Sequence, residues 1–262
     1  MNIALNSTIS FNRTMKKTLI FLTLMLSSLN AGTITIAVAA NVSYAIDDLK
    51  KEFHKQHPEI KVKVILGSSG KLTAQIKHGA PYLLFMSANM RYPQALYKNS
   101  DAITKPVVYA QGALAYLSVK KLDLSQGMQL LTSKKISRIA IANPKTAPYG
   151  IAAMQAIKNA NIYEDIKKKF IYGESISQTV SYTVTATDIG LIAKSSLFSP
   201  KMSRFKKGIN WMDVEAELYT PINQGIVILK EGKNNTEVQA FYDFILSKSA
   251  KKIFKDFGYT TP

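Results

Sequence analysis

The chain has 262 residues, of which 47% are hydrophobic and 19% are charged, a globular composition that excludes disordered and fibrous proteins and can bury one sizeable core or two modest ones. The formal charge of +17 is of a size that often accompanies nucleic-acid binding. The lysines, however, form short scattered clusters without interleaved aromatic residues, so we interpret them as a solvated basic surface and expect no nucleic-acid partner.

The first 31 residues have the features of an export signal. Lys16 and Lys17 precede an apolar run at 19–29, and a run of about a dozen residues is shorter than the ~20 that span a bilayer. We therefore predict that residues 1–31 are a signal peptide, with Met15 as an alternative start of translation. The chain has no cysteine that could carry a lipid, so we expect a soluble periplasmic protein.

Beyond the signal, segments rich in isoleucine and valine alternate with segments of helical period, which predicts an α/β protein. The expected strands are, in chain order, 33–40, 61–66, 84–86, 138–142, 189–193 and 222–229. In the helix after the first strand, Ile46, Leu49 and Phe53 share one face. The last long helix should bury a face formed by Val238, Phe241, Tyr242, Ile245 and Leu246.

The apolar segment at 107–119 is long enough to run between two lobes. The strand at 222–229 and the last long helix are expected to return the chain to the lobe in which it began. We therefore predict two lobes, each a mostly parallel sheet flanked by helices, joined by two hinge crossings. Residues 32–111 and 222–262 would form the first lobe and residues 112–221 the second, with a cleft between them.

Four strand-to-helix turns carry small, hydroxyl or amide residues where a helix should begin. They are Ala40-Asn41-Val42-Ser43, Gly67-Ser68-Ser69-Gly70, Ala147-Pro148-Tyr149-Gly150 and Glu174-Ser175-Ile176-Ser177. A helix N-terminus offers unpaired backbone N–H groups and the positive end of the helix dipole, so it binds anions without a cationic side chain. Each turn taken alone is better explained by an ordinary N-cap. Their joint position at the carboxyl ends of strands favours a ligand site.

Several runs of the sequence, in this order, resemble periplasmic molybdate-binding proteins of ABC importers. These runs are TITIAVAANVS, GSSGKLTAQIKHGAP, SANM, IANPKTAPYGIAAM, GESISQTV, DIGLIAKSS and AFYDFILSKSAKKIFKDFGY. The resemblance covers nearly all of the mature chain. It implies a type II periplasmic binding protein fold that closes on molybdate or tungstate, with no other cofactor, and a monomer that delivers the anion to the membrane permease of an importer.

The resemblance also implies the residues that hold the anion. Asn41 and Ser69 would bind it from the first lobe, and the backbone amides of Tyr149 and Ile176 from the second. A tyrosine that some members place in a strand of the second lobe is replaced by Ala193 here, which leaves the choice between molybdate and tungstate open.

Other functions fit the sequence less well. Sulfate or phosphate could bind to the same fold, but phosphate keeps a proton at neutral pH and needs an acceptor carboxylate. We expect Glu174, which lies next to a donor turn, to cap the helix instead. Ser68 and Lys71 have the S-x-x-K spacing of an exported serine hydrolase, without its partner motifs, so we expect no enzyme. No metal-site spacing occurs among the three histidines, His54, His57 and His78.

Overall fold

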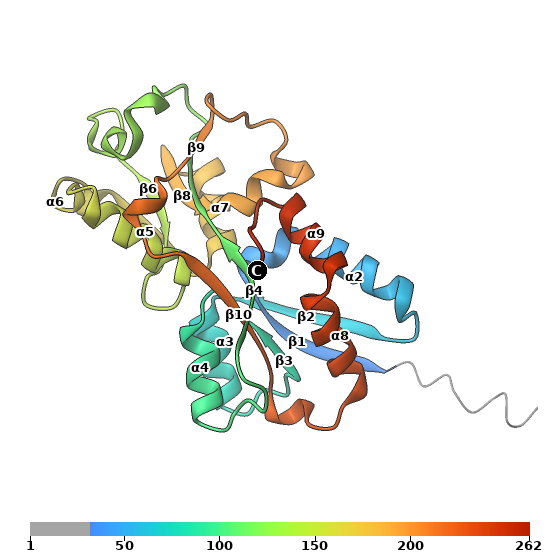
Figure 1. Cartoon of the computed structure of the whole chain (residues 1–262). Helices are drawn as coiled ribbons and strands as arrows, with labels where there is room; N and C mark the ends of the chain where they lie inside the picture. Colours follow the sequence, from blue (N-terminus) through green and yellow to red (C-terminus); the bar gives the residue numbers. More distant parts are fainter. Residues whose placement is uncertain (1–31) are drawn as a thin grey trace, which may run out of the picture.

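Two five-stranded sheets flanked by helices form the protein, as the computed structural model shows (Figure 1). The structure describes residues 32–262, so the predicted signal peptide at 1–31 lies outside the described residues. Between residues 32 and 262, no helix has both the length and the apolar character needed to cross a bilayer. The predicted α/β class is confirmed.

The first sheet has the strand order β2-β1-β3-β10-β4. Its strands are β1 (Thr33–Ala39), β2 (Lys61–Gly67), β3 (Leu84–Met86), β4 (Val107–Gly112) and β10 (Ile222–Ile228). The helices that accompany it are α2 (Ile46–Gln56), α3 (Ser69–Lys77), α4 (Arg91–Lys98), α8 (Thr236–Leu246) and α9 (Lys248–Asp256). Two short 3-10 helices, η1 (Ala40–Tyr44) and η7 (Lys230–Gly232), follow β1 and β10.

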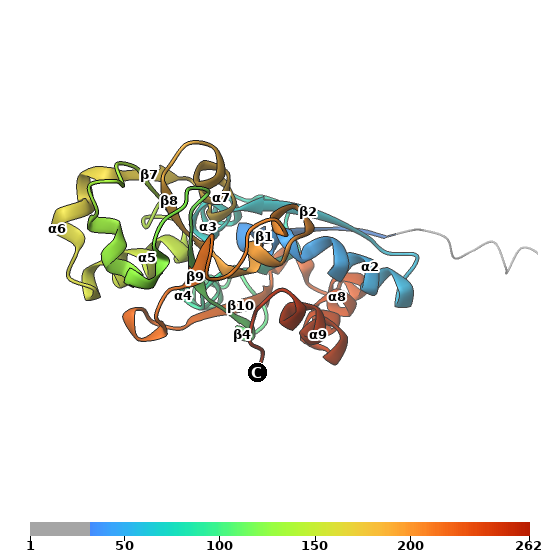
Figure 2. The same cartoon turned by 90° about the horizontal axis from the view of Figure 1, so that it is seen from above.

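The second sheet has the order β7-β6-β8-β5-β9. Its strands are β5 (Leu114–Leu117), β6 (Ile139–Ala142), β7 (Phe170–Gly173), β8 (Ile189–Ala193) and β9 (Trp211–Asp213). Its α-helices are α5 (Pro148–Asn159), α6 (Tyr163–Ile166) and α7 (Ile176–Thr185). Its 3-10 helices are η2 (Leu124–Thr132), η3 (Lys167–Lys169), η4 (Lys194–Phe198), η5 (Pro200–Met202) and η6 (Ala216–Leu218). In both Figures 1 and 2, α5 and α6 lie at one end of the molecule, whereas α2, α8 and α9 lie at the other.

Both sheets are mixed rather than mostly parallel as expected. In the first sheet, β1 pairs in parallel with β2 and β3, whereas β10 pairs antiparallel with β3 and β4. In the second, β6 pairs in parallel with β7 and β8, whereas β5 pairs antiparallel with β8 and β9. The antiparallel pairs involve the strands by which the chain passes between the sheets. One such passage runs from β4 to β5, which are separated only by Ala113.

The helices cover both faces of the first sheet because its buried strands carry apolar side chains on both sides. On one face, Ile36 and Val38 of β1 belong to the same core cluster as residues of α2, α8 and α9. On the other face, Ala37 packs with residues of α3 and α4. The rings of Phe53 and Phe241 meet edge to face at 5.0 Å. In α8 the apolar face is shifted slightly from the predicted one, with Phe244 buried and Leu246 only half-buried.

A buried carboxylate, Asp188, joins three segments of the second sheet. Its Oδ2 accepts hydrogen bonds from the Ser137 amide (2.7 Å), the Ser137 hydroxyl (2.9 Å) and the Arg138 amide (2.9 Å), and its Oδ1 pairs with Lys120. Burial alone would raise the pKa of this carboxyl, but these hydrogen bonds outweigh burial and hold the pKa well below its usual range.

We expect Asp188→Asn to lower the unfolding temperature by about 5–10 °C at pH 7, because it removes hydrogen bonds to a charged acceptor worth about 1.5–3 kcal/mol. Because the folded-state pKa is depressed, the carboxylate stabilises the fold fully above its unfolded value of 3.8 and loses that effect as the pH falls below it. Thermal unfolding at pH 7 and pH 3.5 should therefore show a smaller difference from wild type at the lower pH. An equal difference at both values would contradict this account, and exposed Asp243→Asn is the control.

Candidate functional site

A small cavity between the two sheets brings the four predicted ligand residues together. The space between its protein atoms amounts to about 190 Å³, part of which is open to solvent. The residues that line it are Ala39, Ala40, Asn41, Gly67, Ser68, Ser69, Ala88, Ala147, Pro148, Tyr149 and Ile176. Asn41 and Ser69 are 0% exposed, Tyr149 is 1% and Ile176 is 4%. The four residues come from four separate turns, two beside each sheet, and meet at one point.

Asn41 lies just beyond the carboxyl end of β1. The turn that carries it is the 3-10 helix η1, and the α-helix expected there begins only at Ile46. The Asn41 side chain donates from Nδ2 to Gln224 Oε1 (2.9 Å) and to the Tyr259 hydroxyl (3.0 Å). Its Oδ1 is buried and has no hydrogen-bond partner within the described chain, so Oδ1 is the atom of this side chain left for a further contact.

Ser69 is the first residue of α3, after the N-cap Ser68. Its Oγ accepts a hydrogen bond from the Ala88 amide (2.9 Å). A serine hydroxyl can accept and donate at once. This acceptor bond therefore fixes the oxygen and leaves the hydroxyl proton able to donate into the cavity.

Tyr149 and Ile176 contribute the first free amides of α5 and α7. Proline at the first position of α5 has no N–H, and the following amides of Gly150 and Ile151 bond back to the Ala147 carbonyl (2.9 and 3.1 Å). A helix offers no internal acceptor to its first amides, and no turn bond within residues 32–262 takes the N–H of Tyr149 or Ile176.

The expected role of Glu174 as helix cap is wrong. Ser175 caps α7 instead, since its Oγ accepts from the Gln178 amide (3.3 Å). The Glu174 carboxylate lies outside the helix, exposed, 3.7 Å from Lys71 Nζ of the first sheet's α3. Serine has the shorter side chain and reaches the amide three residues on, which is the geometry of an N-cap.

The described residues of the cavity wall carry no charged side chain, but helix dipoles make the electrostatic potential there positive. No lysine, arginine, aspartate or glutamate is among the described residues that line it. Helices α3, α5 and α7 all begin at its wall, and each N-terminus is equivalent to roughly half a positive charge. The cavity therefore suits an anion small enough to be surrounded by N–H and O–H donors.

Contacts between the two sheets' segments surround the cavity. The Gly70 amide of α3 donates to the Thr146 carbonyl before α5 (2.9 Å), and the Ser195 hydroxyl of η4 donates to the Asn41 carbonyl (3.2 Å). Because these bonds join segments of different sheets, they form only when the two sheets are close together, as in this structure.

Behind Asn41 lies a buried polar cluster that the sequence analysis missed. Gln224 of β10 accepts from the Tyr109 hydroxyl (2.7 Å) and donates to the Tyr149 hydroxyl (3.2 Å). The Tyr259 hydroxyl donates to the Asn41 carbonyl (2.9 Å). Burial raises the pKa of Tyr259 to about 12, and those of Tyr109 and Tyr149 also lie well above the usual value, chiefly because of burial. All three hydroxyls therefore keep their protons at neutral pH.

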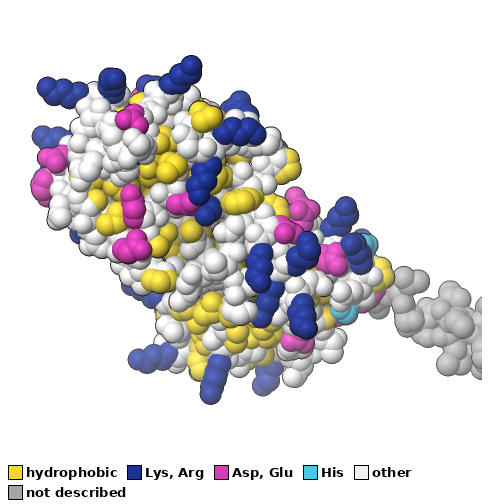
Figure 3. Space-filling model, turned by 45° about the horizontal axis from the view of Figure 1, so that its top comes forward, with side chains coloured by type: hydrophobic (Ala, Val, Ile, Leu, Met, Phe, Trp, Pro, Cys, Tyr) yellow, Lys and Arg dark blue, Asp and Glu magenta, His cyan; other side chains and the backbone are white. Residues whose placement is uncertain are grey.

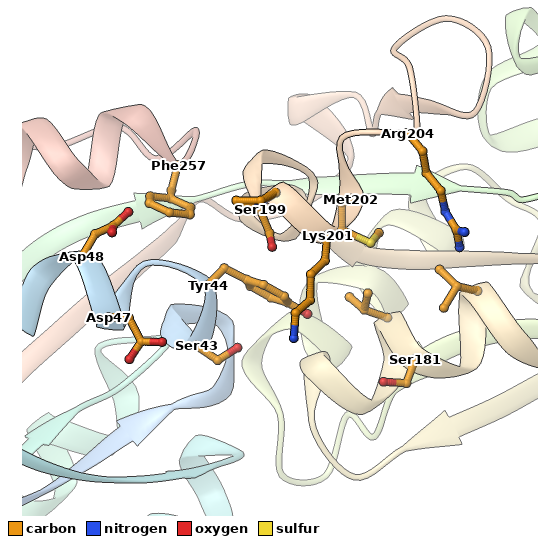
Figure 4. Close-up of a pocket in the computed structure, with 13 residues that line it drawn as sticks. Ser43, Tyr44, Asp47, Asp48, Ser181, Ser199, Lys201, Met202, Arg204 and Phe257 are labelled. Atoms are coloured by element: carbon orange, nitrogen blue, oxygen red, sulfur yellow. The ribbon is translucent and has the colours of Figure 1, made fainter.

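A larger groove on the surface is not lined by any of the four predicted residues (Figure 4). Figure 4 shows Asp47 and Asp48 on one side and Lys201 on the other, and Arg204 lies at its edge. All four are exposed. Because carboxylates and cations are mixed and solvated here, this groove is a poor candidate for binding a small dianion.

The basic residues are spread over the surface, as expected from the sequence. In the face shown in Figure 3, lysine and arginine side chains lie over both parts of the molecule, with aspartate and glutamate among them. This scattered arrangement differs from the continuous basic stripe typical of nucleic-acid-binding proteins.

Comparisons with known proteins find relatives that match most of the chain. The family model described as bacterial extracellular solute-binding protein matches residues 34–260. The chain is 32% identical to the molybdate-binding protein ModA of Azotobacter vinelandii, covering 90% of this chain and 93% of that protein. It is 31% identical to ModA of Rhodobacter capsulatus, covering 88% and 89%. The solved periplasmic molybdate-binding protein of Azotobacter vinelandii superimposes with a TM-score of 0.81 at 29% identity, covering 87% of this chain and 99% of that one.

Proposed function

Because the chain belongs to the bacterial extracellular solute-binding protein family, we propose that it captures molybdate or tungstate in the periplasm and delivers it to the membrane permease of an ABC importer. Its two sheets have the type II periplasmic binding protein fold. The similar proteins named for molybdate binding support this choice of ligand.

One observation carries the proposal: among the described residues, the cavity wall supplies free helix amides and a serine hydroxyl and has no charged side chain. A dianion without protons can accept hydrogen bonds on every oxygen and has none to donate. Free helix amides and hydroxyls match it without a cation. The cavity volume of about 10 Å³ is far below the roughly 300–1,000 Å³ of sites for drug-sized molecules, so a single small ion fits better than a metabolite.

Capture follows from the position of the donors. The lobes are residues 32–111 with 222–262, and residues 112–221. In an open form the anion first meets Asn41 and Ser69 of the first lobe. Rotation about the two crossings then brings the amides of Tyr149 and Ile176 onto its other oxygens and excludes water, which strengthens each hydrogen bond.

The alternatives explain the cavity less well. Sulfate has the charge and shape of molybdate and differs in size, so pocket radius must select between them. Phosphate carries a proton at neutral pH, and no carboxylate is among the described residues of the cavity wall.

A serine hydrolase would need Lys71 to activate Ser68. The Lys71 Nζ, however, lies 3.7 Å from the Glu174 carboxylate, and the Lys71 side chain is 60% exposed. We infer a monomeric binding protein without catalytic activity or a further cofactor.

Calorimetric titration of the mature protein with molybdate, tungstate, sulfate, phosphate and ATP tests this function. We expect tight binding of molybdate and tungstate, and binding of sulfate and phosphate weaker by at least about a hundredfold. Binding of ATP alone, or of phosphate in preference to molybdate, would contradict the proposal.

We expect Ser69→Ala to weaken molybdate binding by about ten- to a hundredfold, because it removes a hydrogen bond to a charged acceptor worth ~1.5–3 kcal/mol. The matched control is Ser177→Ala, in the first turn of α7 but outside the cavity wall. Calorimetry should find Ser177→Ala within about twofold of wild type. Equal affinities for wild type and Ser69→Ala would rule out Ser69 as a ligand.

A further inference from the structure

Gln224 contacts one cavity residue from each sheet, although it does not line the cavity itself. It is 0% exposed and lies on β10 where the pairing with β4 is irregular, between Gln224 and Gly225. Its Oε1 accepts from Asn41 Nδ2 (2.9 Å), and its Nε2 donates to the Tyr149 hydroxyl (3.2 Å). A buried side-chain amide is costly unless it is hydrogen-bonded, so these bonds fix its place.

The direction of these bonds matters for an anion. Both recorded bonds of Asn41 Nδ2 go to groups outside the cavity wall, Gln224 and Tyr259. The remaining polar atom of the side chain, Oδ1, is an acceptor without a partner in the described chain. An acceptor cannot bind an oxyanion that carries no proton. In this orientation the Asn41 side chain therefore suits a protonated oxyanion better than molybdate.

Reversing both amides leaves every group with a partner if the Tyr259 hydroxyl then donates to Asn41 Oδ1, because the Asn41 carbonyl keeps its bond from the Ser195 hydroxyl (3.2 Å). If Asn41 turns its Nδ2 towards the cavity, its Oδ1 can accept from Gln224 Nε2. Gln224 Oε1 can then accept from the Tyr149 hydroxyl, for which no donor bond is recorded among residues 32–262. The Tyr109 hydroxyl, which now donates to Gln224, has a second acceptor in the Ser87 carbonyl at 3.4 Å.

We infer that Gln224 is a positioning residue for anion selectivity: its side-chain amide turns together with that of Asn41, so that Asn41 presents a donor to an oxyanion without protons. This inference rests on the proposed function and assigns Gln224 a role within the same site. Gln224 also bonds to Tyr149 of the second lobe. Rotation of the Gln224 amide therefore couples the orientation of the Asn41 side chain in the first lobe to closure of the second lobe.

Nuclear magnetic resonance of the mature protein labelled with ¹⁵N at glutamine and asparagine side chains tests the turn directly. On addition of molybdate, the Gln224 side-chain amide signal should shift strongly even though Gln224 does not touch the anion. Gln111 on the neighbouring strand β4 is the internal control, since its amide bonds to Asn223 at the surface (2.9 Å), and its signal should stay in place. A Gln224 signal that moves no more than that of Gln111 would overturn the inference.

Calorimetry of Gln224→Met and Gln111→Met gives an independent measure. Methionine keeps the length of the side chain but cannot donate to Asn41 Oδ1. We expect molybdate affinity to fall about tenfold in Gln224→Met and by less than twofold in Gln111→Met. A Gln224→Met protein that binds as tightly as wild type would also overturn the inference, and if it does not fold, the resonance measurement decides. Failure of the wild-type protein to bind molybdate would instead refute the proposed function.

Discussion

Asn41→Asp should abolish molybdate binding, with a loss of at least about a thousandfold at pH 7.5. Aspartate has nearly the shape of asparagine but offers no hydrogen-bond donor when ionised. It also places a negative charge at the wall of the cavity in which we propose that a dianion binds. Like charges brought together in a buried site cost several kcal/mol, and ~4 kcal/mol corresponds to about a thousandfold in affinity. Calorimetric titration of the folded variant measures the loss.

The control for this substitution is Asn235→Asp. Asn235 caps α8 by accepting from the Val238 amide (2.7 Å), and aspartate caps a helix as well as asparagine does. We expect its affinity and unfolding temperature to match those of the wild type. If Asn41→Asp bound molybdate within about threefold of wild type, Asn41 would not face the anion.

Gly70→Ala should weaken molybdate binding by about a hundredfold without destabilising either lobe. A Cβ at Gly70 would lie 2.7 Å from the Tyr92 hydroxyl, the end of a side chain of the same lobe that can move aside. It would also lie 2.9 Å from the Thr146 carbonyl oxygen and 3.0 Å from the Thr146 Cα, which are backbone atoms of the segment before α5. The lobes must therefore stay further apart, which also weakens the bond from the Gly70 amide to the Thr146 carbonyl. Overpacking of about 1–3 kcal/mol and the weakened hydrogen bond together give this magnitude.

The same substitution has the opposite effect on the first lobe by itself. Gly70 lies in helix α3, where alanine is favoured over glycine by up to ~1 kcal/mol. Without ligand, the unfolding temperature should be unchanged or slightly higher, whereas X-ray scattering should show reduced closure with molybdate. Lys71→Ala is the control, since its exposed pair with Glu174 contributes little. Wild-type affinity in Gly70→Ala would show that closure at this point is not needed.

The sequence predicted most of the elements because their signals are local. The strand at 84–86 and the helix after Pro148 lie where expected, since short apolar runs and proline at a helix start are strong signals. The mixed pairing of the sheets was not predicted. It depends on the directions in which β10 and β5 run within their sheets, and the hydrophobic periodicity of the sequence does not encode strand direction. The helix α4 (Arg91–Lys98) was also missed, since only Pro93 and Leu96 of it are buried.

The candidate site could be predicted only in part. The structure brings Asn41, Ser69, Tyr149 and Ile176 to one cavity, in agreement with the positions that the family resemblance implied, and their role as ligands stays a prediction. Gln224 could have been noticed as an amide in the apolar run at 222–229, because a buried polar residue calls for a partner. Its actual partners, Asn41 and Tyr149, lie 183 and 75 residues away, and only the fold brings them together.

A crystal structure of the protein with molybdate tests the central claim most directly. We expect each oxygen of the anion to lie about 2.7–3.2 Å from uncharged donors, which are the Asn41 and Ser69 side chains and the amides of Tyr149 and Ile176. A lysine or arginine nitrogen within that distance of the anion, or α5 and α7 beginning away from it, would contradict the account.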